Sequence, residues 1–181
     1  MDGSLTELQK KYSSSEQKIF FLSYIYILRR LSDMPNARAD KIYNDVLKVV
    51  EGVLGSTTTY QRDLVTLGKR LFGVKFRGVF AADRIPKMNN GQYSILNLDK
   101  ASEPGSHWIA VVKSAGDMLV YDSFGRSSKK IIPSVFKSGN GSVIDTEYDI
   151  EQADSQLNCG ARSITALLVY HIWGREMFLD L

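Results

Sequence analysis

The chain has few of the residues that stabilise small secreted or metal-binding domains. Its 181 residues include one cysteine, Cys159, and two histidines, His107 and His171. A single cysteine excludes an intramolecular disulfide and favours a reducing, intracellular setting. Structural zinc sites usually take four ligands from Cys and His, so three such residues do not predict a metal centre.

Long apolar stretches are also missing. The longest run, residues 19–28, is about ten residues long and contains Ser23, whereas a membrane-spanning helix needs about 20. Residues 1–4 lack the basic start of a secretory signal peptide. We therefore expect a soluble protein that does not bind membranes.

What the chain does contain is typical of one globular domain with an uneven charge. Hydrophobic residues make up 44% and charged residues 24%, close to the average for soluble domains. Residues 56–100 have a net charge of +5, whereas residues 101–181 have a net charge of −3. The basic middle fits a polyanion such as DNA, or an ordinary solvated face. Its basic residues include Lys69, Arg70, Lys75, Arg77 and Lys87.

The first third of the sequence predicts helices. Ser13 and Glu16 fit a capping box that opens a helix continuing to about Leu31. Apolar residues at helical spacing predict a second helix over 39–54, which Gly55 would end. A third helix is expected over about 60–72, with Thr57–Thr59 as its cap.

After residue 75 the pattern changes to short segments rich in Val, Ile, Phe and Tyr. These predict strands over 76–82, 92–98, 107–113 and 118–124. A tight turn at 114–117 would join the last two as a hairpin. A short helix is expected over 129–137, another strand over 142–150, and a final helix from Gly160. This order predicts an α+β fold.

The single cysteine lies where a nucleophile could be activated. Cys159 directly precedes a predicted helix, whose free N–H groups and dipole would stabilise the thiolate. The thiolate is the nucleophilic form. A buried core cysteine is the alternative, but residues 151–158 are strongly polar and indicate a loop at the surface.

A cysteine nucleophile needs a base and a group that orients the base. His171 lies about 18 Å along the same predicted helix, which assigns it to packing or a surface hydrogen bond. His107 is left as the base, and the hairpin brings Asp122 close to it across the strands. The backbone N–H of Cys159 and either Gln152 or Gln156 could bind an oxyanion.

These residues stand in ordered blocks that resemble the adenain family, the adenovirus-type maturation proteases, with relatives in virophages and related DNA viruses. The wider group is the clan of ubiquitin-like-protein proteases. The blocks cover about residues 58–175, and Gln152 precedes Cys159 by seven residues, as the oxyanion glutamine does in that family. The blocks are Phe76-Arg77-Gly78-Val79-Phe80, Asp83-Arg84-Ile85-Pro86, Ile95-Leu96-Asn97, Gly105-Ser106-His107-Trp108, Asp122-Ser123-Phe124-Gly125 and Cys159-Gly160.

The resemblance implies a papain-like, adenain-like cysteine protease with a mixed sheet packed against helices and the cysteine at the start of a central helix. Cys159 would attack the scissile carbonyl, His107 would transfer the proton, and Asp122 would orient His107. Gln152 would stabilise the oxyanion. Trp108 would line the substrate cleft or serve as a core anchor, and Gln156 and Asn158 are the other expected substrate contacts.

The sequence departs from the family at three points. The acid is Asp122, as in cellular relatives of the clan, whereas adenain carries Glu. Adenain continues well beyond its last catalytic helix, so dependence on a DNA or peptide cofactor is not carried over. No cofactor is expected, and activation by DNA or by a peptide stays open. Residues 1–55 have no counterpart, and we interpret them as a helical extension packed on the protease core, residues 56–181.

The resemblance predicts a hydrolase that cleaves viral capsid precursors, at Gly-containing sites, during virion maturation. The protein would act in the infected cell and be packaged in the virion, with DNA as a further candidate partner. Three alternatives stay open: a ubiquitin- or SUMO-like deconjugating protease, an acetyltransferase of the effector type that uses a related site, and a binding module without catalysis.

Overall fold

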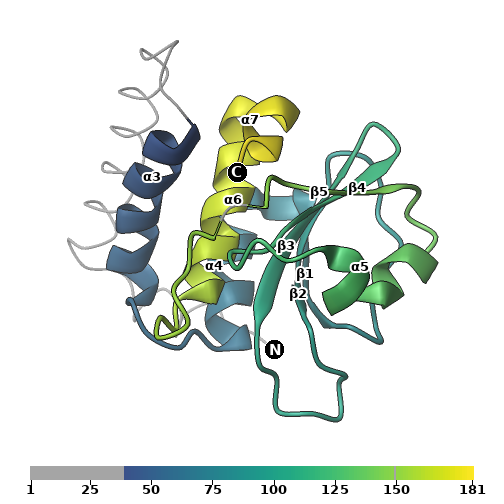
Figure 1. Ribbon diagram of the computed structural model, residues 1–181, viewed down its shortest axis with the longest axis horizontal. Coiled ribbons are helices and arrows are strands. Elements are labelled where there is room, and N and C mark those ends of the chain that lie inside the picture. Colours follow the sequence, from purple (N-terminus) through teal and green to yellow (C-terminus); the bar gives the residue numbers. More distant parts are fainter. Residues whose placement is uncertain (1–38, 149) are drawn as a thin grey trace, which may run out of the picture. The chain divides into compact units, whose positions relative to one another are not determined.

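The computed structural model describes residues 39–148 and 150–181, so the helix expected from Ser13 lies outside the described residues. The α+β architecture predicted from the sequence is confirmed (Figure 1). The helices are α3 (Ala39–Leu54), α4 (Gln61–Phe72), α5 (Ser128–Ile131), α6 (Cys159–Trp173) and α7 (Arg175–Leu179), with 3-10 turns η1 (Gly73–Lys75) and η2 (Pro133–Lys137). The strands are β1 (Phe76–Ala81), β2 (Tyr93–Asn97), β3 (Trp108–Ser114), β4 (Asp117–Tyr121) and β5 (Val143–Asp145).

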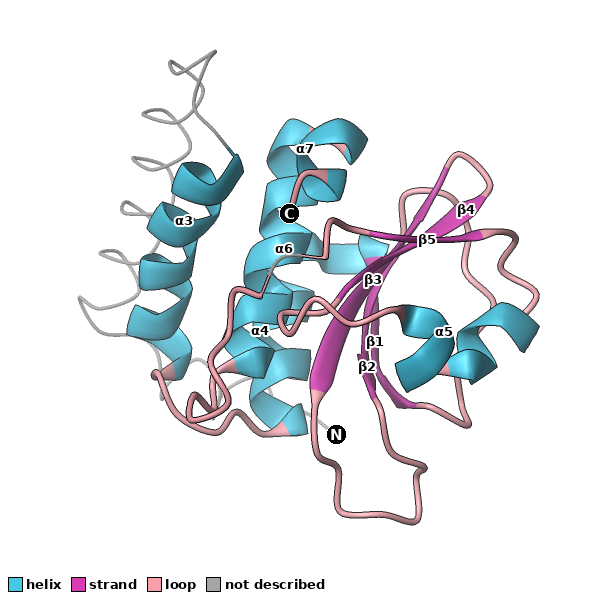
Figure 2. Ribbon diagram, viewed as in Figure 1, coloured by secondary structure: helices cyan, strands magenta, loops and turns pink. Residues whose placement is uncertain are grey.

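The five strands form one mixed sheet in the order β1-β2-β3-β4-β5. The pairs β2–β3 and β3–β4 are antiparallel, whereas β1–β2 and β4–β5 are parallel. The connection between β2 and β3, residues 98–107, projects as a long loop beyond the end of the sheet (Figure 2). His107 is the last residue of that loop, so it enters the sheet at the start of β3.

A two-residue turn sets the register of the β3–β4 hairpin. Ala115 and Gly116 both have positive φ, 50° and 92°, and β3 residue Ser114 pairs with Asp117 directly beside the turn. Positive φ at both central positions is the signature of a type I′ turn, whose twist matches that of paired strands. The predicted tight turn is therefore confirmed. By setting the register, it places the residues that follow β4 beside the residues at the start of β3.

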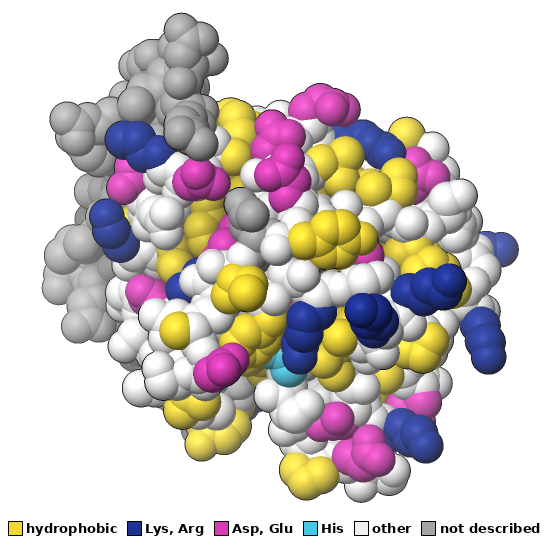
Figure 3. Space-filling model, viewed as in Figure 1, with side chains coloured by type: hydrophobic (Ala, Val, Ile, Leu, Met, Phe, Trp, Pro, Cys, Tyr) yellow, Lys and Arg dark blue, Asp and Glu magenta, His cyan; other side chains and the backbone are white. Residues whose placement is uncertain are grey.

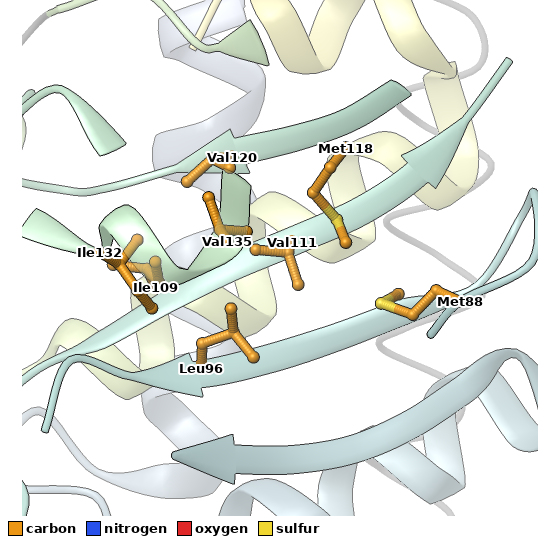
Figure 4. Close-up of a cluster of buried hydrophobic side chains, with 8 residues drawn as sticks. All are labelled: Met88, Leu96, Ile109, Val111, Met118, Val120, Ile132 and Val135. Atoms are coloured by element: carbon orange, nitrogen blue, oxygen red, sulfur yellow. The ribbon is translucent and has the colours of Figure 1, made fainter. Parts of the chain in front are cut away.

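Both faces of the sheet are covered, which explains why β2 is buried throughout and β3 is buried from Ile109 onward. Helix α6 packs against β3 on one face, with α3 outside α6, while α5 lies on the other side of the sheet (Figure 1). The second face carries a buried apolar cluster that joins β2, β3 and β4 to the α5–η2 segment (Figure 4). Its members are Met88, Leu96, Ile109, Val111, Met118, Val120, Ile132 and Val135.

Helix α6 is the centre of the helical layer. Ten consecutive residues, Gly160 to Val169, are buried, because α3, α4, α7 and β3 surround the helix. Helix α3 presents Ile42, Val46 and Val50 as a buried stripe and packs on α6. The second helix of the predicted extension thus belongs to the same compact unit as the sheet.

Several predicted boundaries were wrong. Helix α4 begins after Tyr60 without a side-chain cap, because Thr59 is instead buried against Gly160. The strand expected over 142–150 is limited to Val143–Asp145, and the strand expected over 118–124 ends at Tyr121. In the part of the chain that the structure describes, no helix combines the length and the apolar character needed to cross a membrane.

The contact between Gly160 and Thr59 gives a test of how α6 is seated. A Cβ at Gly160 would lie 2.7 Å from the Thr59 Cβ, so Gly160→Ala should lower the free energy of unfolding by about 1–3 kcal/mol. Gly52→Ala is the matched control, because its Cβ would meet no described atom within 4 Å and should stabilise helix α3 by about 0.4–1 kcal/mol. Urea denaturation measures both; equal stability of the two variants would contradict the packing.

Candidate active site

The fold places Cys159 at the first residue of α6, as the sequence predicted. The thiol is partly buried, and burial by itself raises its pKa. Hydrogen bonds from His107 and from the backbone N–H groups of Trp108 and Gly160 outweigh this effect and lower the pKa of Cys159 below its ordinary value. The sulfur is therefore held in a position that favours the thiolate.

His107 lies between the cysteine and an aspartate. Its imidazole is 6% exposed, and its Nε2 is 2.6 Å from Asp122 Oδ1. When Nε2–H donates to this carboxylate, Nδ1 is left for the hydrogen bond with the Cys159 thiol. The Phe124 ring packs against the imidazole with a centroid separation of 4.9 Å and so limits its rotation.

The three groups shift one another's protonation. Burial lowers the pKa of His107, but its hydrogen bonds with Asp122 and Cys159 raise the pKa above its ordinary value overall. Burial raises the pKa of Asp122, but hydrogen bonds from His107 and Arg126 hold it below its usual range. A lowered thiol pKa beside a raised imidazole pKa favours a thiolate–imidazolium pair.

Asp122 reaches His107 along a diagonal of the hairpin. The register pairs Ala110 with Tyr121, so a continued ladder would place Ile109 opposite Asp122. His107 lies two residues before Ile109, just ahead of β3, a separation that side chains on a shared face can bridge. The sequence prediction that the hairpin unites these residues agrees with the structure, although they are not direct cross-strand partners.

Sequence reasoning missed Arg126. Its Nε donates to Asp122 Oδ2 at 2.7 Å and one terminal nitrogen to Oδ1 at 3.3 Å, while its guanidinium lies 4.8 Å from the Phe124 ring centre. Asp122 thus binds the imidazole and the arginine at once, and the Phe124 N–H donates to its Oδ1 as well. A single arginine in an irregular loop gives no periodic signal, and its four-residue spacing from Asp122 predicts a contact only in a helix, which residues 122–126 do not form.

Gln152 is fixed in a buried position beside the Asp122 segment. Its side chain is 2% exposed, and its Oε1 accepts a hydrogen bond from Ser123 Oγ at 2.6 Å. Its Nε2 donates to the carbonyl oxygen of Gln156 at 2.6 Å, and its backbone N–H donates to the Ser123 carbonyl. An amide nitrogen has two hydrogens, so one remains for a further acceptor.

The three expected substrate contacts, Trp108, Gln156 and Asn158, differ in their surroundings. Trp108 donates from Nε1 to the Thr59 carbonyl at 3.0 Å and also lines an open hollow of about 320 Å³, so it is both anchored and accessible. Asn158 is 4% exposed and bonds Glu51 and Arg162, while the Gln156 side chain accepts from Ala153 N–H and from Arg162. The side chains of Gln156 and Asn158 therefore have partners within the protein.

The second histidine lies away from this site, as the sequence predicted. His171 Nδ1 is 3.1 Å from the Tyr93 hydroxyl, and its ring packs edge-on against Phe72. Among residues 39–148 and 150–181, no three His, Cys, Asp or Glu side chains gather in a group that could hold a metal ion.

No protein-family model matches the chain, and no curated protein matches it in sequence. A buried imidazole bonded to both a carboxylate and a thiol at a helix start is an arrangement suited to nucleophilic attack by sulfur.

Replacing Arg126 tests the electrostatics of Asp122. The pKa of Asp122 is lowered in the folded protein, so its stabilising contribution is present above its unfolded pKa, about 3.9, and is lost as pH falls through the folded value. In Arg126→Gln the contribution should be smaller and its loss should be complete at a higher pH, because the folded pKa of Asp122 rises when one of the groups that lower it is removed. Urea unfolding measured across acidic pH checks the shift.

Lys129→Gln is the matched control for this experiment. It removes the same charge from the same segment, but Lys129 is not among the hydrogen-bond partners of Asp122. If the acid profiles of the two variants moved together, net charge rather than the ion pair would explain the result.

Proposed function

We propose that the chain is a cysteine endopeptidase with a papain-like, adenain-like fold. The observation that carries the proposal is the hydrogen-bonded series Asp122–His107–Cys159, with the cysteine at the start of a buried helix. The α+β architecture, in which α6 packs on a mixed sheet that delivers the histidine and the aspartate, supports it.

The reaction follows from these contacts in two stages. The Cys159 thiolate attacks the scissile carbonyl carbon, and the carbonyl electrons move to oxygen to give a tetrahedral oxyanion. His107 then donates its proton to the leaving amine, and the C–N bond breaks to leave a thioester. In the second stage water attacks the thioester, His107 takes the water proton, and the acid product leaves as the thiolate is restored.

Two donors would stabilise the oxyanion. The backbone N–H of Cys159 belongs to the first turn of α6, where backbone N–H groups have no partner inside the helix. The remaining Nε2 hydrogen of Gln152 would be the second donor. Asp122 keeps the imidazole in the tautomer and orientation that the proton transfers need.

The proposed substrates are viral capsid precursors cut at Gly-containing sites, in infected cells and within the virion. The half-buried Trp108, which directly follows His107 in the chain, is the proposed contact for the peptide. No cofactor is needed for this chemistry. DNA is a second proposed partner, because basic residues on α4, η1 and β1 are exposed, namely Lys69, Arg70, Lys75 and Arg77. On the face shown in Figure 3, further Lys and Arg side chains lie beside a histidine.

Removing the reacting groups tests the proposal directly. Cys159→Ala and His107→Ala should abolish cleavage of a Gly-containing capsid peptide while keeping the circular dichroism spectrum of the wild type. His171→Ala should keep wild-type activity, because that ring packs against Phe72 and Tyr93. Gln152→Ala should lower kcat by about 10²–10³-fold, or about 2.7–4 kcal/mol, if its amide binds the oxyanion.

Parallel substrates separate this proposal from its alternatives. A fluorogenic ubiquitin-like substrate that is cleaved in preference to the capsid peptide would assign the site to a deconjugating protease. Acetyl transfer from acetyl-CoA without hydrolysis would assign it to a transferase. Cleavage retained by Cys159→Ala would contradict every account in which the thiol reacts.

A further inference from the structure

A set of hydrogen-bonded polar side chains, several of them buried, connects α3 to the segment before the cysteine, residues 151–158, which we call the Cys159 loop. Its centre is Arg162, which is 6% exposed and lies on α6, three residues after Cys159. The Arg162 guanidinium donates from Nε to Asn158 Oδ1 at 3.0 Å, and from its two terminal nitrogens to Gln156 Oε1 at 3.2 Å and to the Tyr43 hydroxyl at 3.4 Å. One side chain thus joins two loop residues to α3.

Helix α3 also binds the loop directly at one end and through Tyr121 at the other. At the cysteine end, Glu51 Oε1 accepts a hydrogen bond from Asn158 Nδ2 at 2.6 Å. At the other end, the Tyr43 hydroxyl is 2.5 Å from that of Tyr121, and Tyr121 donates to the Glu151 carboxylate. Both ends of the Cys159 loop are therefore held by contacts that lead to α3.

The loop carries the candidate oxyanion donor. Gln152 Nε2 donates to the backbone carbonyl of Gln156, and the Gln156 side chain is itself bound by Arg162. The position of the Gln152 amide therefore depends on where Arg162 holds Gln156. Because an unpaired buried polar atom is unfavourable, the hydrogen bonds of the buried Gln152, Asn158 and Arg162 favour one arrangement of the loop.

Apolar packing alone does not explain these contacts. Helix α3 already buries a stripe of Ile42, Val46 and Val50 against the rest of the unit, which would suffice to attach it. Directing the Glu51 carboxylate and the Tyr43 hydroxyl at the loop costs desolvation free energy, and these groups are not needed to attach the helix. Their partners lie in the segment that leads into Cys159.

We propose that α3 is a positioning element of the active site, in which Glu51 and Tyr43, together with Arg162, hold the Cys159 loop so that the Gln152 amide faces the developing oxyanion. The inference rests on the proposed peptidase function and deepens it. Tyr43 and Glu51 lie within residues 1–55, which have no counterpart in the family that the sequence resembles. In this proposal they help to set the geometry of the reaction. None of these three residues touches the substrate.

Glu51→Ala is the deciding variant, with two companions. Glu51→Gln keeps an Oε1 that can accept the hydrogen bond from Asn158, so its kcat should be close to that of the wild type. Asp45→Ala is the matched control on the same helix, because within the described residues Asp45 pairs with the exposed Lys41 and Lys48, and the variant should behave as wild type. The measurements are kcat and KM on the capsid peptide, alkylation of Cys159, and hydrogen exchange of the loop amides.

Glu51→Ala should lower kcat by about 10- to 100-fold with nearly unchanged KM, since a small displacement of a transition-state donor affects the chemical step. Alkylation of Cys159 should be unchanged, because the donors to its sulfur are His107 and two backbone N–H groups outside the network. The N–H groups of Gln152 and Gln156, bonded to Ser123 and Ala153, should exchange faster.

Wild-type kcat or wild-type loop exchange in Glu51→Ala would overturn the inference, even if the melting temperature fell. If the wild-type protein hydrolysed no peptide, the proposed function would fail instead. In that case the exchange measurement alone would decide whether α3 holds the loop. Faster exchange would support the positioning contact, and unchanged exchange would reject it.

Discussion

The hydrogen bond between His107 and Asp122 is the interaction on which the rest of the site depends. It forms because the type I′ turn at Ala115 and Gly116 fixes the β3–β4 register, which brings the residue after β4 within reach of the residue before β3. Once Asp122 holds Nε2, the other ring nitrogen faces the thiol. The sheet thus supplies an oriented base, and α6 supplies the sulfur at its first residue.

The helical layer has a corresponding constraint. Helix α6 must be buried on nearly every side so that its start is held against the sheet, and Gly160 permits this by letting Thr59 approach. Burial on this scale leaves Arg162 inside the protein, where its charge needs partners. It finds them in α3 and the Cys159 loop, so the packing that seats the cysteine also organises the segment before it.

Local sequence patterns predicted part of the fold and of the candidate site. Apolar spacing predicted α3 and α6, the change to β-rich segments predicted four strands, and the turn predicted the hairpin that unites His107 with Asp122. Arg126 and Arg162 could not be predicted, because their partners depend on tertiary contacts and a lone arginine has no periodic signature. The expected substrate contacts Gln156 and Asn158 each accept a hydrogen bond from Arg162, a tertiary contact that no local pattern indicates.

The most direct test of the account is the pKa of the Cys159 thiol, measured from the pH dependence of its alkylation in the wild type and in His107→Ala. The account predicts a wild-type pKa below that of free cysteine, about 8.5, and a higher value without the imidazole, because burial would then be opposed by the two backbone donors alone. A wild-type thiol that titrates at or above the free value, with no response to His107→Ala, would contradict it.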